Sequence, residues 1–365
     1  MLIQKFTTLF KDVTRQGTKI PKEEYLSHGK NIIIDQGQDI IAGYTNCEDG
    51  IFKKIPAIVF GDHTRIIKYV DTPFFLGADG VKVLKCTDKD ANYRYLYYAL
   101  KNAHIPNTGY NRHFKWLKEI TINYPDKNRQ NDIVNILDKL EYIIKMKSQE
   151  LDKFDELIKA RFVEMFGDPF NNPQKFDMAR LGDIADLVSG GTPSRKNMKF
   201  YNGNIPFITT VALGPNYVES KNAQDFITLE GVNNSSTKVI RKNTLLIGTR
   251  VGVGKTSITN DNMAINQDIV ALNNVDMASY DLFYLKAVLD QYQYYFNLQK
   301  RGATIKGITS KIIKQVQIPI SPIDLQKKYH NFVQQVDKSK FENIVYLNKT
   351  LSSKILSQLG DAIRD

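Results

Sequence analysis

The sequence is poor in the residues that build metal centres, disulfide frameworks and membrane spans. It has two cysteines, Cys47 and Cys86, and five histidines, and neither set shows the spacing of a metal site. No apolar run reaches the length of about 20 residues that a membrane helix needs. The first residues also lack the layout of a signal peptide. We therefore expect a cytoplasmic protein with no metal site and no disulfide framework.

Catalytic motifs are missing as well. A DNA methyltransferase needs an Asp/Asn-Pro-Pro-aromatic turn, and the nearest strings, at 168–170 and 172–174, each lack the second proline. The glycine-rich stretch 248–256 resembles a phosphate-binding loop, but Thr249 stands where that motif requires a glycine, six positions before Lys255. The residues that follow are β-branched and turn-forming, so we expect two strands around a glycine turn, whereas a phosphate-binding loop must open a helix.

The positive charge of the chain is unevenly placed. The net charge is +11 and the pI is about 9.3. Residues 126–165 hold eight Lys and Arg against nine Asp and Glu, and residues 322–365 hold seven against five. The excess therefore lies on 1–125 and 166–321. This distribution favours an acidic partner such as nucleic acid, bound by the globular parts of the chain.

The clearest positive feature is an internal duplication. The stretch 116–130, with the segment after it, recurs 196 residues later as 312–326. In both copies alternating apolar residues predict a short strand from 116 or 312 onward, followed by a proline-containing turn, a glutamine (Gln130 or Gln326) and a long apolar-periodic segment. A period this long is too large for a solenoid repeat and indicates a duplicated module of about half the chain.

Shorter similarities extend the duplication. Residues 10–13 are matched with 181–184, and each block precedes a Gly-Thr pair. Equivalent strands are predicted at 57–60 and 245–247, and equivalent helices at 93–102 and 280–291. We therefore predict an α+β fold class, with two similar α/β-type globular units.

Two segments are predicted to form unusually long helices. No glycine or proline interrupts the chain between Asn128 and Phe166, or between 323 and Gly360, and apolar residues recur in steps of three and four. The predicted seam residues are Leu137, Leu140, Ile144 and Leu151 in the first segment and Leu347, Leu351 and Ile355 in the second. Since an average globular helix has about 11–12 residues, we predict that the two helices pair with each other. The alternative is that each packs on its own domain.

Basic side chains in glycine- and aromatic-rich loops are the candidates for phosphate contacts. In the first unit these DNA-binding candidates are Lys19, Lys53, Lys54, Arg65, Arg112 and Lys115. In the second unit they are Arg195, Lys196, Lys199, Arg250, Lys255, Arg301 and Lys306. The alternative for each is a solvated surface charge.

In their order and duplication, these motifs resemble the specificity subunit of type I restriction–modification enzymes. The resemblance rests on the repeated blocks 116–165 and 312–361, on 181–193, on Gly254-Lys255 and on the Phe-x3-Phe-Gly-Asp-Pro run 162–169. It implies two target-recognition domains, each reading one half of a bipartite asymmetric DNA sequence. It also implies that the two long helices run antiparallel as a coiled coil, with pseudo-twofold symmetry, and set the spacer between the half-sites. The implied segments are 1–125 and 167–321 for the domains, and 126–166 and 322–365 for the helices.

The same resemblance implies partners. Two adenine-N6 methyltransferase (modification) subunits and optionally two motor-nuclease restriction subunits would bind this chain and double-stranded DNA. S-adenosylmethionine, ATP and Mg would be held by those subunits, with no cofactor and no catalytic residue on this chain. The first copy lacks the Gly-Thr-Pro and Gly-Lys pairs of the second, so the two halves are expected to contact DNA differently. The alternatives are a phosphate-binding-loop nucleotide enzyme or self-contained DNA-modifying enzyme, and a basic protein that binds RNA or an acidic partner.

Overall fold

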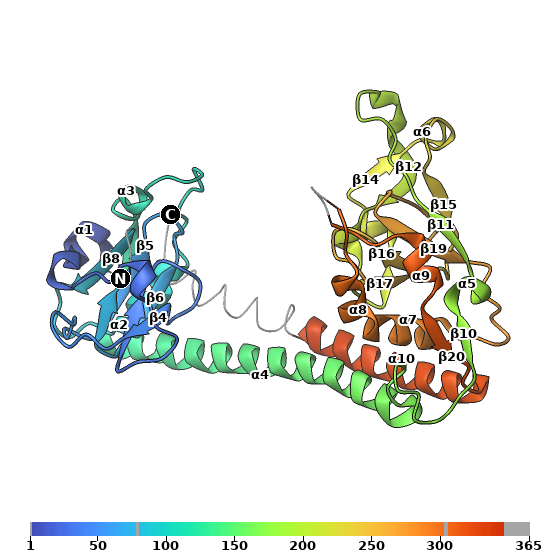
Figure 1. Cartoon of the computed structure of the whole chain (residues 1–365). Helices are drawn as coiled ribbons and strands as arrows, with labels where there is room; N and C mark the ends of the chain where they lie inside the picture. Colours follow the sequence, from blue (N-terminus) through green and yellow to red (C-terminus); the bar gives the residue numbers. More distant parts are fainter. Residues whose placement is uncertain (1, 78–79, 303–305, 347–365) are drawn as a thin grey trace. The chain divides into compact units, whose positions relative to one another are not determined.

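The computed structural model describes residues 2–77, 80–302 and 306–346, and this part of the chain divides into two units (Figure 1). The first unit runs to Gln149 and also includes the stretch that begins at Asn343, and the second spans Glu150–Glu342. Both units combine small β-sheets with short helices, which confirms the predicted mixed fold class. No helix within the described ranges is both long and apolar enough to cross a membrane.

The first unit contains a four-stranded sheet, a three-stranded sheet and a two-stranded pair. The four-stranded sheet has the order β2 (Phe10–Asp12), β8 (Val81–Cys86), β5 (Ala57–Gly61), β6 (Ile67–Val70). The three-stranded sheet has the order β4 (Gly43–Thr45), β3 (Asn31–Ile34), β7 (Phe74–Leu76), and β1 (Leu2–Lys5) pairs with β9 (Thr121–Tyr124). The helices are α1 (Phe6–Leu9), α2 (Tyr93–Lys101) and α3 (Phe114–Leu117).

The second unit contains larger versions of the same sheets. One has the order β11 (Asp186–Ser189), β19 (Ile269–Asn273), β16 (Leu245–Gly248), β17 (Thr256–Thr259), β13 (Tyr217–Val218). The other has the order β14 (Asp225–Ile227), β12 (Tyr201–Ile208), β18 (Met263–Ile265), β15 (Lys238–Ile240), and β10 (Met178–Arg180) pairs with β20 (Gln317–Pro319). The helices are α5 (Leu181–Ile184), α6 (Leu229–Asn233), α7 (Leu282–Gln291), α8 (Gln293–Leu298) and α9 (Ser310–Lys314).

The two units share one topology. The order β2-β8-β5-β6 in the first unit is repeated as β11-β19-β16-β17 in the second, with the same antiparallel pairings. In the smaller sheets, β3 pairs parallel with β7 and antiparallel with β4, as β12 does with β18 and β14. The predicted equivalence of β5 with β16 and of α2 with α7 is confirmed, and so is the internal duplication.

One predicted correspondence is wrong. Residues 181–184 form helix α5, whereas residues 10–13 begin in strand β2, so the two blocks are not equivalent. The counterpart of α5 is α1: the backbone N–H of Phe6 donates to Ile120 O at 3.0 Å, and that of Leu181 donates to Val316 O at 2.8 Å. What the two helices share is an apolar residue at each end that is buried in the core.

The duplicated terminal strands are shorter than their alternating pattern predicts. Leu117 ends helix α3 and Ile313 lies in helix α9, and the strands begin only at Thr121 and Gln317. Both apolar residues are fully buried. The alternation arises because a helical turn and the strand after it direct apolar side chains into one core, which a period-2 pattern alone does not distinguish from a longer strand.

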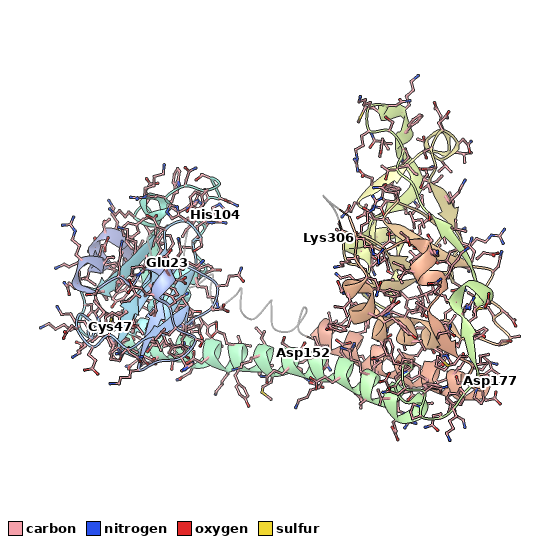
Figure 2. The ribbon with its side chains drawn as sticks, in the orientation of Figure 1. Glu23, Cys47, His104, Asp152, Asp177 and Lys306 are labelled. Atoms are coloured by element: carbon pink, nitrogen blue, oxygen red, sulfur yellow. The ribbon has the colours of Figure 1, made fainter. Side chains whose placement is uncertain are left out.

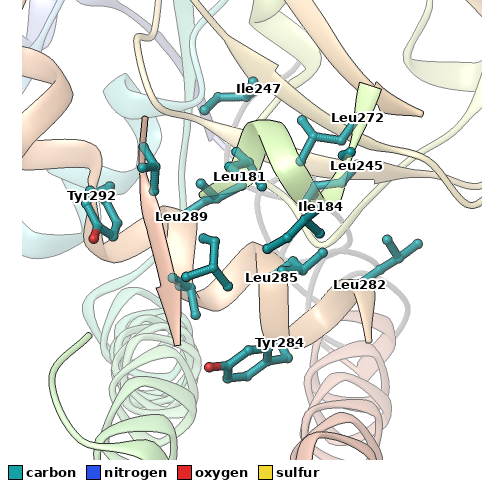
Figure 3. Close-up of a cluster of buried hydrophobic side chains, with 14 of the residues drawn as sticks. Leu181, Ile184, Leu245, Ile247, Leu272, Leu282, Tyr284, Leu285, Leu289 and Tyr292 are labelled. Carbon is teal, nitrogen blue, oxygen red and sulfur yellow. The ribbon is translucent and has the colours of Figure 1, made fainter. Parts of the chain in front are cut away.

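The core of the second unit lies between its large sheet and helix α7 (Figure 3). Leu245, Ile247 and Leu272 from the sheet meet Leu285 and Leu289 from the helix. Burying each of these side chains contributes about 1.5–3 kcal/mol. Helix α7 is therefore held to the sheet by one apolar face.

Tyr284 lies on the opposite side of α7, toward the long helices (Figure 3). Its ring centroid is 4.8 Å from that of Phe166, and its hydroxyl donates to Pro319 O at 2.7 Å. The two faces of α7 thus connect the sheet to the long helices within the second unit.

The first long helix forms as predicted. Helix α4 (Lys127–Phe166) is continuous over 40 residues, and α10 is described over Ile323–Tyr346. Leu137 and Leu140 are buried in the core of the first unit and Leu151 is half-buried, while Ile144 is 36% exposed. The predicted seam partners Leu347, Leu351 and Ile355 lie outside the described residues, so their pairing stays a prediction.

Contacts between α4 and α10 run in opposite directions along the two helices. Lys147 Nζ donates to Asn343 Oδ1 at 3.0 Å. Further along α4, Asp155 pairs with Lys340, and the ring of Phe162 lies 5.6 Å from that of Tyr329. Residues with higher numbers in α4 therefore contact residues with lower numbers in α10.

Candidate nucleic-acid interface

A groove on the first unit collects basic side chains from distant parts of the chain. We call it the first-unit groove; it has a volume of about 660 Å³. It is lined by Asp12, Val13, Thr14, Arg15, Gln16, Gly17, Lys19, Asp62, Gly80, Val81, Lys82 and Arg112. Of the predicted DNA-binding residues, Lys19 and Arg112 meet here. Arg15 and Lys82 were missed, although Arg15 lies four residues before Lys19, and Lys82 lies in strand β8 between the buried Val81 and Val83.

One carboxylate offsets part of this positive charge. Lys82 Nζ lies 3.2 Å from Asp12 Oδ2, and the backbone N–H of Thr14 donates to Asp12 Oδ1 at 3.0 Å. Partial burial raises the pKa of the Asp12 carboxyl, but hydrogen bonds from Thr14 and Lys82 outweigh that effect and lower the pKa below its usual value. Asp12 is therefore ionised at neutral pH and fixes Lys82. Arg15, Lys19 and Arg112 also line the groove, and Asp62 is a second carboxylate there, so four cations face two carboxylates and the groove has an excess of positive charge.

The other first-unit candidates do not line the groove, and their contacts differ. Lys54 Nζ donates to Oε1 of Gln16 on the groove wall at 2.9 Å. Arg65 is half-buried, and its Nη1 donates to Ile105 O at 3.1 Å, so it ties the turn after β5 to the segment after α2. Lys115 Nζ lies 4.9 Å from the ring centre of Trp116, and Lys53 is exposed. The structure therefore gives Arg65 a scaffold contact that the sequence did not predict.

The segment 105–113 is fixed beside the groove by a buried histidine. His113 is fully buried; its backbone N–H and its Nδ1 lie 2.8 and 3.0 Å from Asp62 O. Because a carbonyl oxygen only accepts, Nδ1 carries the hydrogen. Nε2 is then free to accept from the Thr108 backbone N–H at 3.4 Å and lies 3.3 Å from its Oγ1.

In the second unit the glycine-rich turn between β16 and β17 carries two of the predicted DNA-binding residues. The two strands pair antiparallel, as predicted, and no helix follows the turn, so a phosphate-binding-loop fold is excluded. Gly252 and Gly254 have φ values of +66° and +78°, which side-chain-bearing residues rarely adopt. Arg250 and Lys255 are both exposed on this turn, and Arg250 Nη1 lies 3.3 Å from Asp268 Oδ1.

Two further segments adjoin this turn. The backbone N–H of Ile308 donates to Thr249 O at 2.8 Å, and Arg301 and Gly307 exchange backbone hydrogen bonds at 2.9 and 3.0 Å. A Cβ built on Gly307 would lie 2.8 Å from Arg250 Cγ, so these segments are in direct contact. Arg301 and Lys306 are exposed, the latter on the loop labelled in Figure 2. The surface thus brings Arg250, Lys255, Arg301 and Lys306 onto neighbouring loops.

The remaining second-unit candidates lie on the loop 190–199. The Thr192 hydroxyl donates to Gln267, which joins this loop to the segment that carries Asp268. Arg195 pairs with Asp225 at 2.6 Å, and its guanidinium lies 5.1 Å from the ring centre of Tyr201. Lys196 and Lys199 are exposed. Residues 266–268 therefore connect the loop 190–199, which carries Arg195, to the turn that carries Arg250.

The two basic surfaces are built from equivalent loops. After β5, Asp62 donates its backbone N–H to Gly80 O at 2.6 Å and accepts from His113 N–H. After β16, Thr249 donates to Asp268 O at 2.8 Å and accepts from Ile308 N–H. The backbone framework is repeated while the side chains differ, and different DNA contacts by the two halves stay a prediction. Within the described part of the chain, no group of three His, Cys, Asp or Glu residues is placed to hold a metal.

Comparison with known proteins gives one family. The model of the type I restriction modification DNA specificity domain matches residues 9–153 and 173–352. The EcoR124I/EcoR124II specificity subunit of Escherichia coli is 27% identical over 331 residues, covering 84% of this chain and 79% of that protein. The MjaIX specificity subunit of Methanocaldococcus jannaschii is 25% identical over 190 residues, covering 52% and 42%. The HindI specificity subunit of Haemophilus influenzae is 27% identical over 194 residues, covering 53% and 40%.

Solved structures share the fold. The type I restriction–modification S subunit from M. genitalium superposes with a TM-score of 0.58 at 17% identity, covering 100% of this chain and 96% of that one. A chain from a study of complex assembly and conformational transition in the type I system superposes with a TM-score of 0.56 at 17% identity, covering 98% and 94%. At these identities the likeness concerns the fold alone.

Proposed function

The chain belongs to the type I restriction modification DNA specificity family, and on that basis we propose that it is the DNA-specificity subunit of a type I restriction–modification complex. The observation that carries the proposal is the repeated basic surface: both units present cations on the same framework of loops. One target-recognition domain (1–125) reads one half of a bipartite DNA site, and the other (167–321) reads the second half.

The basic loops divide the work of binding. Lys19, Arg15 and Arg112 in the first-unit groove, and Lys255 with its neighbours in the second unit, contact phosphates and fix the position of each domain on the duplex. Such contacts carry no sequence information, which comes from side chains that reach base edges. Since the loops differ in sequence between the units, the two half-sites differ, and the complete site is asymmetric.

The long helices set the spacing. The antiparallel contacts of Lys147, Asp155 and Phe162 with α10 support pairing of the two helices as a coiled coil. Helix α4 has 40 residues and packs into the core of the first unit near its start and into that of the second unit near its end. On this proposal the length of the stretch between these contacts sets the number of unread base pairs between the half-sites.

Chemistry takes place on partner subunits. Two adenine-N6 methyltransferase subunits bind this chain and carry S-adenosylmethionine, and two restriction subunits with ATP and Mg complete the complex where they are present. This assembly operates in the cytoplasm. The competing assignment, a nucleotide-hydrolysing enzyme, would require a helix after residues 248–255, and strand β17 stands there instead.

The test is a domain exchange. Strand β10 and helix α5 pack against β20 and α9, and these four elements connect the domain to the long helices. They are therefore kept, and the segment to exchange is 186–308. Replaced by the equivalent segment of a relative, it should change one half-site in the host methylome and leave the other half-site and the spacer unchanged. The reciprocal control exchanges the first-unit segment between β2 and His113. A simultaneous change in both half-sites would contradict the modular assignment.

A further inference from the structure

The first unit presents an aromatic stack on its basic surface. Tyr110 is 87% exposed, the highest value among the exposed large apolar side chains in the described residues. Its ring lies 4.7 Å from that of His63, centroid to centroid, and the two planes differ by 9°. The imidazole of His63 therefore covers one face of the Tyr110 ring and holds the ring in position, while the other face is exposed to water.

The short loop that carries Tyr110 has a defined backbone. Gly109 has a φ of +78° and its N–H donates to Asn107 Oδ1 at 3.2 Å. The N–H of Asn111 donates to Gly109 O at 2.8 Å, and the Asn111 side chain donates to Thr108 O. The contact of His113 with Thr108 and Asp62 then fixes the loop to the turn after β5. Tyr110 is thus presented by a fixed loop.

His63 is also fixed. It follows Asp62, and its backbone N–H donates to Gln36 Oε1 at 3.2 Å. The stack therefore joins two segments that both reach the first-unit groove, since Asp62 and Arg112 line it. Tyr110 lies within two residues of one groove cation and beside the turn that forms the groove wall.

Resting on the proposed function, we infer that Tyr110 is a specificity-determining residue of the first half-site, which reads the edge of a base in the major groove. The cations of the groove bring a phosphate backbone to this surface, and Tyr110 is an exposed aromatic side chain beside them. In a duplex the faces of the bases are stacked on one another, so a protein side chain meets their edges in the grooves.

The stack of Tyr110 on His63 favours contact with a base edge over intercalation of the ring between base pairs. A ring inserted between two base pairs needs both of its faces, and His63 covers one face of Tyr110. The open face, the ring edge and the phenolic hydroxyl remain. The hydroxyl donates to a purine N7 or O6 or to a thymine O4, and the ring packs against a thymine methyl group.

The experiment uses the complete methyltransferase complex and a DNA library randomised over both half-sites. Tyr110→Ala should lose the preference at one base position of one half-site, on the order of tenfold, because that position loses its contact with the tyrosine. The preferences of the other half-site and the slope of log affinity against log salt should not change. Tyr110→Phe separates the two modes: a loss equal to that of Tyr110→Ala assigns the contact to the hydroxyl, and a retained preference assigns it to the ring.

Two controls accompany these variants. Arg112→Ala should weaken binding uniformly across sequences and reduce the salt slope by about one. Tyr142→Ala removes another exposed tyrosine, 63% exposed on helix α4 and outside the groove, and should leave all base preferences unchanged. Folding of the Tyr110 variants is checked by the fluorescence of Trp116, the single tryptophan of the chain, which lies in the same unit.

Three results would overturn the inference. Normal methylation by Tyr110→Ala with all base preferences of the parent would refute it and leave the proposed function standing. Loss of the methyltransferase subunits from the purified Tyr110→Ala complex would make Tyr110 a protein-interface residue instead. A parent complex that methylates no bipartite site would refute the proposed function, and this inference with it.

Discussion

The side-chain oxygen of Gln326 accepts a hydrogen bond from the backbone N–H of Asp281 at 2.8 Å, and Gln326 is fully buried. In the first unit Gln130 makes the same contact with the backbone N–H of Asn92, at 3.1 Å. Asp281 and Asn92 are the N-caps of α7 and α2, so each glutamine joins the start of a long helix to the start of a domain helix. The duplicated glutamine therefore connects each domain to the helix that follows it.

Removing either glutamine should destabilise its own unit. Gln326 Nε2 also donates to Ser279 O and Ser321 O, at 3.1 and 2.7 Å, and Gln130 Nε2 donates to Pro125 O at 2.8 Å. A buried group left without its partner costs about 1–3 kcal/mol, so Gln326→Ala and Gln130→Ala should each lower the free energy of unfolding by about 2–4 kcal/mol.

Urea titration with two probes separates these effects. Trp116 fluorescence follows the first unit alone, and far-UV circular dichroism follows both units. Gln130→Ala should move the fluorescence midpoint, and Gln326→Ala should move only the circular dichroism transition. Gln335→Ala, at an exposed position of α10, is the control and should move neither. A fluorescence shift with Gln326→Ala would show that the units do not unfold separately.

The free energy of unfolding of the second unit should fall at alkaline pH because of Tyr284. Burial raises the pKa of its phenol from 10.0 to about 12. The folded state keeps the proton while the unfolded state loses it, so the stabilisation is complete below pH 10 and is lost as the pH rises to 12. Two pKa units correspond to about 3 kcal/mol at most.

Tyr284→Phe isolates this contribution. The variant should lose about 1 kcal/mol at neutral pH, because Pro319 O loses its donor. Between pH 10 and 12 its free energy of unfolding should fall less steeply than that of the parent. Other tyrosines, such as Tyr329 with its raised pKa, titrate in both proteins and cancel in the difference. Equal slopes for parent and variant over this range would contradict the prediction.

Lys255 should contribute more to DNA affinity than Arg250. Both are exposed on the β16–β17 turn, but the Arg250 guanidinium lies 3.3 Å from Asp268, which offsets part of its charge. In the complete complex Lys255→Ala should reduce the slope of log affinity against log salt by about one, and Arg250→Ala by less. Lys153→Ala, an exposed lysine on α4, is the control. If neither turn variant changes affinity or slope, this turn does not face DNA.

Lengthening both long helices should lengthen the recognised spacer. Seven residues inserted after Ser148, matched by seven after Phe341, fall between the Lys147–Asn343 and Asp155–Lys340 contacts and preserve both. Seven residues are two coiled-coil turns and add about 10 Å, or about three base pairs at 3.4 Å each. Methylome mapping should find a longer spacer between unchanged half-sites. An unchanged spacer would mean that the helices do not set it.

The sequence alone determined the features that depend on local pattern and on repetition. The uninterrupted periodic stretch predicted α4, and the β-branched residues after Lys255 predicted a strand where a phosphate-binding loop needs a helix. The recurrence of residues 116–130 predicted two units of one topology. Helix periodicity, strand propensity and internal similarity are properties of neighbouring residues, and they can be recognised without knowing what packs against them.

Only the tertiary structure decided which basic residues share a surface. Lys19 and Arg112 meet in the first-unit groove with Arg15 and Lys82, whereas Arg65 is used to anchor a loop. It also decided that α1, and not residues 10–13, is the counterpart of α5. Convergence of side chains from distant segments depends on strand order and on the backbone hydrogen bonds between loops. Those contacts join residues far apart in the chain, and the local sequence pattern carries no record of them.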